Sequence, residues 1–445
     1  MKRLVAAFAA ALLVAGVVSV SLADDGESAE NWARWRGEAG MGVSSAKALP
    51  AEWSASKNVQ WKTPIEGRGL SSPIIWGNRV FLTTAVTGEP APEGHKAPVH
   101  MINGQPWKHP DAIGADRVHT LKVVALDRAS GKILWERTAY QGPIYDDYHK
   151  RNTNASATPV TDGKKLFAFF GSEGLYAYDF SGKLAWKADI APISTMSVGG
   201  GGSPILYENL LIVQCDRGDG KGSDIVAYDK DNGKVVWRTS REGIQLSWTT
   251  PIVVDASGDP QLITSASEFT VAYHPRTGKE LWRTEGVKSN AIPSPLAGHG
   301  MIYVFTGYPR KKVMGLRLVA DSAPEVVWTY DRGTAYVPSP ILYGDYLYLT
   351  SDKGILTCLN ARTGEVVYAD GRVPVPATFM ASLIAYNGAI YQFGEDGDTF
   401  VVKAGPQHEV VRTNSLGEPV YATPSLAGDT LFVRGEKHLF AIRGN

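Results

Sequence analysis

The chain has 445 residues, and its 45 Lys and Arg side chains are balanced by 45 Asp and Glu side chains. Because there is no excess of positive charge to hold a polyanion, nucleic acid is not an expected partner. Hydrophobic residues make up 44% of the chain, and only two residues are cysteines. A chain of this length can therefore build a large core without covalent cross-links.

The first residues, MKRLVAAFAAALLVAGVVSVSLA, start with basic side chains, continue with an apolar run and end on the small residues Ser21 and Ala23. This order is typical of a signal peptide, so we expect residues 1–23 to be cleaved and the product to be periplasmic or secreted. A retained membrane anchor is the alternative, although the run is near the lower limit for spanning a bilayer. No cysteine lies near Ala23 to carry a lipid, so we expect no stable membrane insertion after cleavage. We also expect the protein to be a monomer.

Residues 24–52 contain Trp32 and Trp35 but no repeated unit, and they predict an irregular strap that lies on the following domain. No linker or change of composition interrupts the rest of the chain. We therefore assign residues 53–445 to one domain.

A strand-turn-strand unit recurs through this domain, as in AYDKDNGKVVW (227–237). Asp229 can cap the turn, Gly233 can take the left-handed conformation that closes it, and Trp237 lies in the next strand. Similar units are ALDRASGKILW (125–135), AYDFSGKLAW (177–186), AYHPRTGKELW (272–282) and CLNARTGEVVY (358–368).

Each unit is preceded by a small residue and a proline that open an apolar strand. The openings lie at Pro73, Pro159, Pro204, Pro251, Pro295, Pro340, Leu383 and Pro424. From Pro159 onward they are spaced by 41 to 47 residues, a period that predicts an all-β, eight-bladed β-propeller. The last unit lacks an outer strand, whereas NVQWKTP (58–64) has no blade before it, so we expect this N-terminal strand to close the eighth blade.

A Trp recurs in the outer strand of most units. An indole there can dock between neighbouring blades and bury a large apolar area, so we interpret these residues as structural. They are Trp61, Trp135, Trp186, Trp237, Trp282 and Trp328.

The unit Ala-x-Asp-x-x-Thr-Gly-Lys-x-x-Trp, preceded by Ser-Pro, resembles the pyrroloquinoline-quinone-like (PQQ-like) propeller repeat. This repeat occurs in quinoprotein dehydrogenases and in the propeller lipoprotein of the outer-membrane β-barrel assembly machinery. The likeness runs from about Trp53 to Asn445 and implies the fold, but one propeller can carry unrelated activities.

The dehydrogenases of this family hold their quinone between an indole and a disulfide of adjacent cysteines, with calcium bound by Glu, Asn and Asp. In this chain the two cysteines are Cys215 and Cys358, in blades too far apart for a disulfide. We therefore expect two buried free thiols and neither PQQ nor calcium as a cofactor.

The loops that join successive blades emerge on the same face as the hairpins between second and third strands, and a local binding site is expected there. These loops mix aromatic, charged and amide side chains, as a peptide or glycan site would and as an ordinary solvated rim also does. The candidates are Arg68, His149, Arg151, Asn152, Asn154, Trp248, Asn290, Tyr336, Phe379 and Tyr421.

An insertion in the first blade, residues 86–118, is rich in Pro, Gly and His and shows no strand pattern. We call it the flap. Together with the next loop it offers His95, His100, His109 and His149, and Asp111 lies among them. Imidazole and carboxylate groups bind zinc, copper or nickel, but the spacing matches no known metal motif and such a flap needs no metal.

These observations favour a non-enzymatic exported propeller that binds a protein or peptide of the cell envelope, for example in outer-membrane protein assembly. No catalytic residues are assigned. The alternative is a quinone- or metal-dependent oxidoreductase that uses the channel-mouth face.

Overall fold

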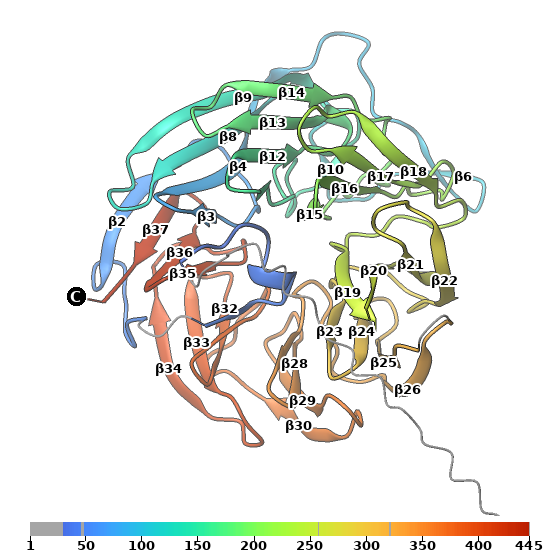
Figure 1. Cartoon of the computed structure of the whole chain (residues 1–445). Helices are drawn as coiled ribbons and strands as arrows, with labels where there is room; N and C mark the ends of the chain where they lie inside the picture. Colours follow the sequence, from blue (N-terminus) through green and yellow to red (C-terminus); the bar gives the residue numbers. More distant parts are fainter. Residues whose placement is uncertain (1–29, 46–48, 257, 320–321, 445) are drawn as a thin grey trace, which may run out of the picture.

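The structure is a computed structural model that describes residues 30–45, 49–256, 258–319 and 322–444. Eight sheets, each built on four antiparallel strands, are arranged around a central axis (Figure 1). The predicted eight-bladed propeller is therefore confirmed. The expected signal peptide and the start of the strap lie outside the described residues. Within the described part of the chain, no helix is long and apolar enough to cross a membrane.

Each blade has four main strands, which follow one another from the axis outward. Blade 1 has β3 (Ile74–Trp76), β4 (Arg79–Pro90), β8 (Arg117–Asp127) and β9 (Ile133–Pro143); blade 2 has β11 (Val160–Thr161), β12 (Lys165–Phe169), β13 (Leu175–Asp179) and β14 (Leu184–Ala188). Blade 3 has β15 (Ile205–Tyr207), β16 (Leu210–Cys215), β17 (Asp224–Asp229) and β18 (Val235–Ser240); blade 4 has β19 (Ile252–Ala256), β20 (Asp259–Ser265), β21 (Phe269–Tyr273) and β22 (Glu280–Glu285).

The second half of the ring repeats the same plan. Blade 5 has β23 (Leu296–Gly298), β24 (Met301–Thr306), β25 (Lys312–Arg317) and β26 (Glu325–Tyr330); blade 6 has β27 (Ile341–Tyr343), β28 (Tyr346–Thr350), β29 (Leu356–Asn360) and β30 (Val366–Gly371). Blade 7 has β31 (Ile384–Tyr386), β32 (Ala389–Phe393), β33 (Asp398–Lys403) and β34 (Val410–Ser415); blade 8 has β35 (Ser425–Ala427), β36 (Thr430–Arg434), β37 (His438–Ile442) and β2 (Val59–Pro64).

The N-terminal strand β2 closes the ring as predicted. It pairs antiparallel with β37, and Trp61 lies opposite Ala441. One sheet therefore contains both ends of the domain, which removes the open edge that blade 8 would otherwise present.

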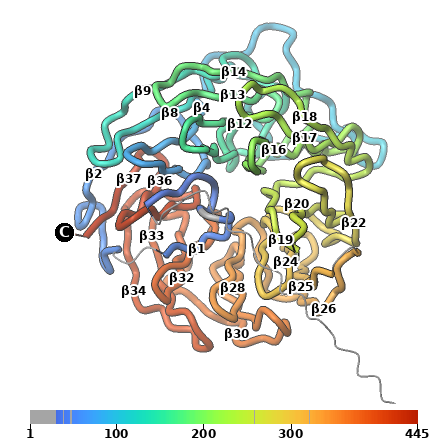
Figure 2. The backbone as a smooth tube through the Cα atoms, viewed as in Figure 1, coloured from blue at the N-terminus to red at the C-terminus, as the bar shows by residue number. Residues whose placement is uncertain are grey.

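The strap is bound more deeply than a surface segment would be. Its strand β1 (Val43–Ser44) follows the 3₁₀ turn η1 (Glu38–Gly40) and pairs in parallel with the inner strand β31. Figure 2 shows this strand on the inner side of the ring. The fully buried Arg36 donates hydrogen bonds to the carbonyl oxygens of Pro340 and Leu383. Burial lowers the pKa of this guanidinium to about 9.

The recurring Trp and Gly of the repeat meet at the blade interfaces. A Cβ on Gly233 would come within 2.6 Å of the Trp186 ring of the preceding blade, and the Trp186 indole donates a hydrogen bond of 3.0 Å to the Lys230 carbonyl in the same turn. Equivalent indole bonds of 2.9 to 3.1 Å run from Trp61 to Arg128, Trp135 to Phe180, Trp237 to Pro275 and Trp328 to Ala361. Trp282 differs and donates to Gln261 Oε1 at 2.8 Å.

Both cysteines are free and buried, as expected. Burial raises the pKa of Cys215 well above its usual range and that of Cys358 to about 12. Since thiolate is the reactive form, both thiols are inert packing groups at neutral pH.

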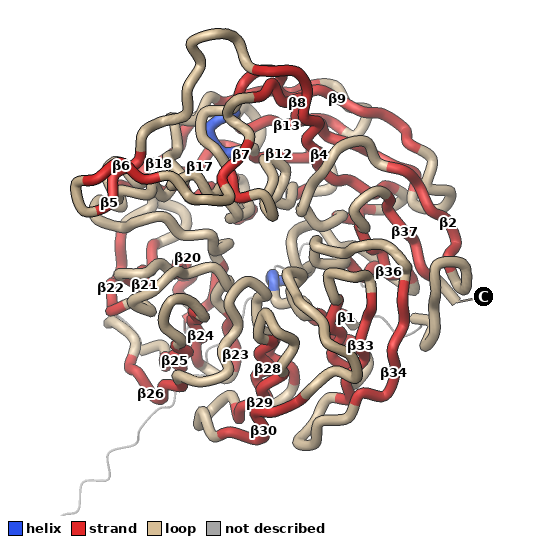
Figure 3. The backbone as a smooth tube through the Cα atoms, turned by 180° about the vertical axis from the view of Figure 1, so that it is seen from behind, coloured by secondary structure: helices blue, strands red, loops and turns tan. Residues whose placement is uncertain are grey.

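The flap contains more regular structure than the sequence predicted. Strands β4 and β8 remain paired as far as Pro90 and Arg117, so only residues 91–116 leave the blade. They form the hairpin of β5 (His100–Ile102) and β6 (Gln105–Trp107), and the short β7 (Ala112–Ile113), which pairs with β10 (Tyr148–His149). The flap lies across the face seen in Figure 3, opposite the strap that faces the viewer in Figure 1.

Replacing Gly233 with Ala tests the blade interface. The positive φ of 74° and the contact with Trp186 both oppose a Cβ. Gly344 is the matched control, because its φ is 60° but no atom of the described residues lies within 4 Å of an added Cβ. We expect Gly344→Ala to lower the free energy of unfolding by about 1 kcal/mol through backbone strain alone. Gly233→Ala should cost a further ~1–3 kcal/mol through overpacking. Equal losses in chemical denaturation would contradict this interface.

Candidate functional site

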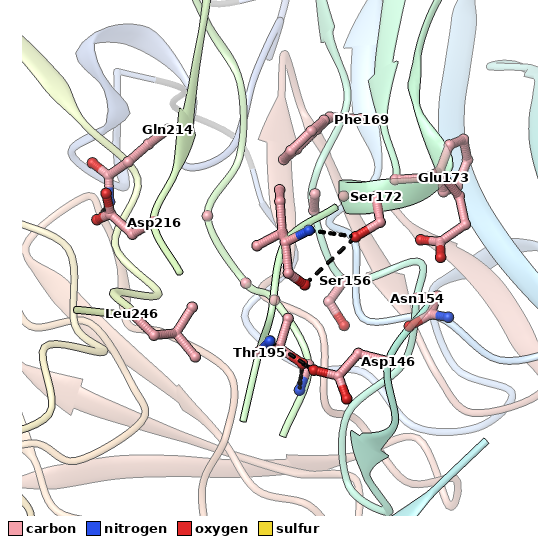
Figure 4. A pocket seen from close by; sticks show the side chains of 18 of the residues that line it. Asp146, Asn154, Ser156, Phe169, Ser172, Glu173, Thr195, Gln214, Asp216 and Leu246 are labelled. Carbon is pink, nitrogen blue, oxygen red and sulfur yellow. Dashed lines mark hydrogen bonds between the residues drawn. The ribbon is translucent and has the colours of Figure 1, made fainter. Parts of the chain in front are cut away.

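A cavity of about 80 Å³ opens among the loops of blades 1 to 4 on the face that carries the flap (Figure 4). The loop between blades 2 and 3 contributes Thr195 and the backbone of Gly199–Gly202, and hairpins of blades 2 and 3 contribute Glu173 and Asp216. The volume suffices for several water molecules or a small group of a ligand. Its lining combines carboxylates, hydroxyls and amides with a few apolar side chains, and no Lys or Arg of the described residues lines it.

Two of the four lining carboxylates are held by cationic side chains. Asp216 accepts hydrogen bonds of 2.6 and 3.1 Å from Arg241, and both side chains are fully buried. Asp147 lies 2.6 Å from the Lys108 ammonium and also accepts the Ala115 N–H. These carboxylates are therefore engaged in the framework of the loops.

Glu173 differs from these two, because no ion pair with it occurs among the described residues. Its Oε1 accepts the Tyr145 N–H at 2.9 Å. Burial nevertheless raises the pKa of Glu173 to about 7. The protonated form of this carboxyl is therefore substantially populated at neutral pH and can donate a hydrogen bond into the cavity.

The fourth carboxylate, Asp146, anchors the flap. His100 is buried in the hairpin β5–β6, and its Nε2 lies 2.9 Å from Asp146 Oδ1, while its Nδ1 lies 3.2 Å from Ser194 Oγ. The other oxygen of Asp146 accepts the Thr195 N–H at 2.7 Å. Ser194 does not line the cavity, so we interpret the Ser194–His100–Asp146 chain as the link that holds the flap on the ring.

The predicted metal candidates separate into two kinds. His109 and His149 come together, and Asp111 joins them, with ligand atoms of all three within 4.8 Å of one another. His95 instead contacts the Ile144 carbonyl at 3.0 Å, and His100 is part of the flap anchor. Of the four predicted histidines, only His109 and His149 therefore lie close enough together to bind one metal ion.

Several predicted binding-face residues support the loop at Gly199–Gly202. Asn152 donates to the carbonyls of Val198 and Gly200, and the Trp248 indole donates to the Gly199 carbonyl at 2.8 Å. Asn154 lines the cavity directly.

A second group lies on the loops that join blade 8 to blade 1, blade 1 to blade 2, and blade 7 to blade 8. Arg68 donates to the Lys150 carbonyl and stacks 5.7 Å from the centroid of the Tyr421 ring. Arg151 forms an ion pair with Glu395 of blade 7. This pair joins loops that are 244 residues apart in sequence.

The remaining predicted residues lie away from the cavity. Tyr336 packs against Tyr308, with ring centroids 5.3 Å apart, and the backbone of Asn290 is bonded to Tyr308. Phe379 is only 2% exposed and packs against Phe400. It therefore supports the core beneath its loop and offers no surface to a partner.

The cavity does not fit the quinone site that the family resemblance implies. That site needs a disulfide of adjacent cysteines, whereas Cys215 and Cys358 are single buried thiols. A carboxylate that could bind calcium, Asp216, is already neutralised by Arg241. We therefore derive no chemistry through a quinone.

Comparison with known proteins agrees with the predicted propeller repeat. Residues 119–370, more than half of the chain, match the family model described as outer membrane protein assembly factor BamB. The chain belongs to this BamB family. The other comparisons find similarity both to BamB and to proteins with other names.

A solved structure of BamB from Moraxella catarrhalis superposes with a TM-score of 0.54 at 13% identity, over 81% of this chain and 98% of that one. A europium-containing methanol dehydrogenase gives 0.52 at 13% identity, over 94% and 92% of the two chains. At 13% sequence identity, these two structural similarities show only that the folds are alike.

Among curated proteins, the tetrathionate hydrolase of Acidithiobacillus ferrooxidans is 22% identical over 347 residues, which are 73% of this chain and 61% of that protein. The matched region therefore spans about three fifths of the length of this relative.

The raised pKa of Glu173 predicts a pH-dependent stability. The folded protein holds this proton more tightly than the unfolded chain, so the stabilising contribution is present at low pH and is lost as the pH rises through about 7. We expect Glu173→Gln to be as stable as the parent protein near pH 4, below the pKa of the unfolded chain, and about 1–3 kcal/mol more stable at pH 8. Chemical denaturation at the two pH values measures this. An equal difference at both pH values would show that the carboxyl is ionised throughout.

Proposed function

We propose that this BamB-family propeller is an exported, non-enzymatic binding module of the cell envelope. In this proposal the flap hairpin β5–β6 contacts a protein partner, either an outer-membrane protein or a component of its assembly machinery. The observation that carries the proposal is a group of exposed apolar side chains on a hairpin that is itself fixed to the ring.

The exposed group consists of Val99, Met101 and Ile102, with exposures of 75%, 53% and 40%. His100, between them in sequence, is only 5% exposed and is held by Asp146. The hairpin therefore presents apolar surface from a fixed position and avoids the entropy cost of ordering a loose loop on binding. Exposed apolar side chains that gather in one place favour a protein contact.

The repeat itself explains most other exposed apolar side chains, but not these. Leu134, Leu184, Val235, Leu281, Val326, Val366 and Val411 each lie on the outer strand of a different blade. They recur with the blade and therefore belong to the architecture. The flap is not repeated in the other blades, so the exposure of its apolar side chains needs a separate explanation.

The family supports an envelope role, because its model carries the name of an outer membrane protein assembly factor. The likeness to tetrathionate hydrolase offers a catalytic alternative. Tetrathionate is an anion, however, and no Lys or Arg of the described residues lines the cavity to bind it. The cavity therefore gives a hydrolase of that anion little support.

A photo-crosslinking amino acid placed at Met101 should give one or a few discrete adducts in intact envelopes, because a partner would cover this side chain. The same group at Val235 is the matched control, since Val235 is a similarly exposed apolar residue, at 49%, on the rim of blade 3. Mass spectrometry of the Met101 adducts should identify outer-membrane proteins or their assembly components. Identical adduct patterns at the two positions would contradict the proposal, as would consumption of tetrathionate by the purified protein.

A further inference from the structure

Three potential metal ligands meet where the flap returns to the ring. His109 and Asp111 follow the flap strand β6, and His149 lies in β10 of the loop between blades 1 and 2. The ligand atoms of the three side chains lie within 4.8 Å of one another, and Nε2 of His149 is 3.5 Å from Oδ2 of Asp111. The imidazole rings of His109 and His149 meet edge to face at 4.9 Å between centroids.

We propose that His109, Asp111 and His149 form a zinc site that fastens the flap to the blade 1–2 loop. Two imidazoles and one carboxylate are a common three-ligand set for Zn²⁺, and the fourth tetrahedral position is open to water. The site lies apart from the cavity, and it does not depend on the proposed protein partner.

The backbone already holds the ligands in position. Strands β7 and β10 are paired, with His149 opposite Ala112. The Lys150 N–H donates to the Asp111 carbonyl at 2.9 Å, and the His109 N–H donates to Ser197 Oγ at 2.9 Å. Ligands of one tetrahedral zinc ion lie about 3.3 Å apart when each is about 2.0–2.1 Å from the metal. Small side-chain rotations from the present positions therefore suffice.

Three existing interactions would have to break when zinc binds. The Lys150 ammonium lies 2.8 Å from Asp111 Oδ1 and competes with a cation for this carboxylate. The Nδ1 atoms of His109 and His149 each accept the N–H of the residue two positions on, at 3.1 Å. Binding through Nε2 requires the ring proton on Nδ1, so these two local contacts must open. Both imidazoles are partly exposed, so water can replace the lost backbone contacts.

The identity of the competing lysine makes the proposal specific. Removing the Lys150 ammonium should free Asp111 and strengthen zinc binding at this site. Zinc bound adventitiously elsewhere on the protein would hardly respond to this change. His274 supplies a matched control, because its Nδ1 accepts the Arg276 N–H in the same local geometry but it belongs to no ligand cluster among the described residues.

The test is a competition titration of untagged, chelator-treated protein with Zn²⁺ against a chromophoric chelator. We expect one equivalent of zinc to bind and to raise the melting temperature, because a ligand of the folded state stabilises it. His149→Ala and Asp111→Asn should each weaken binding at least tenfold, Lys150→Met should strengthen it severalfold, and His274→Ala should leave it unchanged.

Circular dichroism of each variant without zinc checks that the ring is folded. If a variant fails this check, X-ray absorption of the zinc-loaded parent protein decides instead, with a first shell of two imidazole nitrogens and carboxylate and water oxygens as the expected result. The proposal is overturned if the parent protein binds no zinc at micromolar concentration, or if His109→Ala/His149→Ala binds it as tightly as the parent.

Discussion

A single hydrogen bond between neighbouring blades, repeated around the axis, organises the ring. In seven of the eight blades, the residue before the opening Pro or Leu donates its backbone N–H to the side-chain hydroxyl of the equivalent residue in the next blade, at 2.8 to 3.0 Å. The series runs through Ser72, Thr158, Ser203, Thr250, Ser294, Ser339, Ser382 and Thr423. All these groups are buried, so each unmade bond would leave a polar atom unsatisfied in the core. Together with the indole that covers the glycine of the next turn, this bond fixes the position of each blade relative to its neighbour.

The series has one break, and the chain closes the ring there by other means. Ser72 Oγ has no hydrogen-bond partner among the described residues. Across this seam, Ser425 donates its hydroxyl to the Pro73 carbonyl, and the buried Arg434 donates to Ser71 Oγ and the Thr83 carbonyl. Strand β2 completes blade 8, while the strap pairs with blade 7 and bridges to blade 1 at Trp32 and Ile75. The N-terminal segment therefore replaces a repeated contact with several unique ones.

The sequence predicted the parts that recur. Eight openings and the Gly-Lys-x-x-Trp turns indicated the number of blades, and the unmatched strand around Trp61 indicated the closure, because periodic patterns report local geometry. Contacts made once leave no such pattern. The link from His100 to Asp146 joins positions 46 residues apart, and nothing in the local sequence of either one marks it. For the same reason the flap was predicted as a strandless insertion, and Phe379 was assigned to a binding face although it is buried. The metal candidates were predicted by residue type alone, and only the fold could select His109 and His149 from four histidines.

The rigid ring and the fixed flap together explain how a repeated scaffold can acquire a specific surface. The repeat supplies stability, and one insertion supplies an apolar hairpin whose position is set by a buried histidine. Hydrogen–deuterium exchange tests this account most directly. We predict that amides of residues 98–116 exchange slowly in the parent protein, and that Asp146→Asn accelerates exchange in this segment while the strands of blades 4 to 6 stay protected. Exchange of the flap at the rate of an unstructured peptide in the parent protein would contradict it.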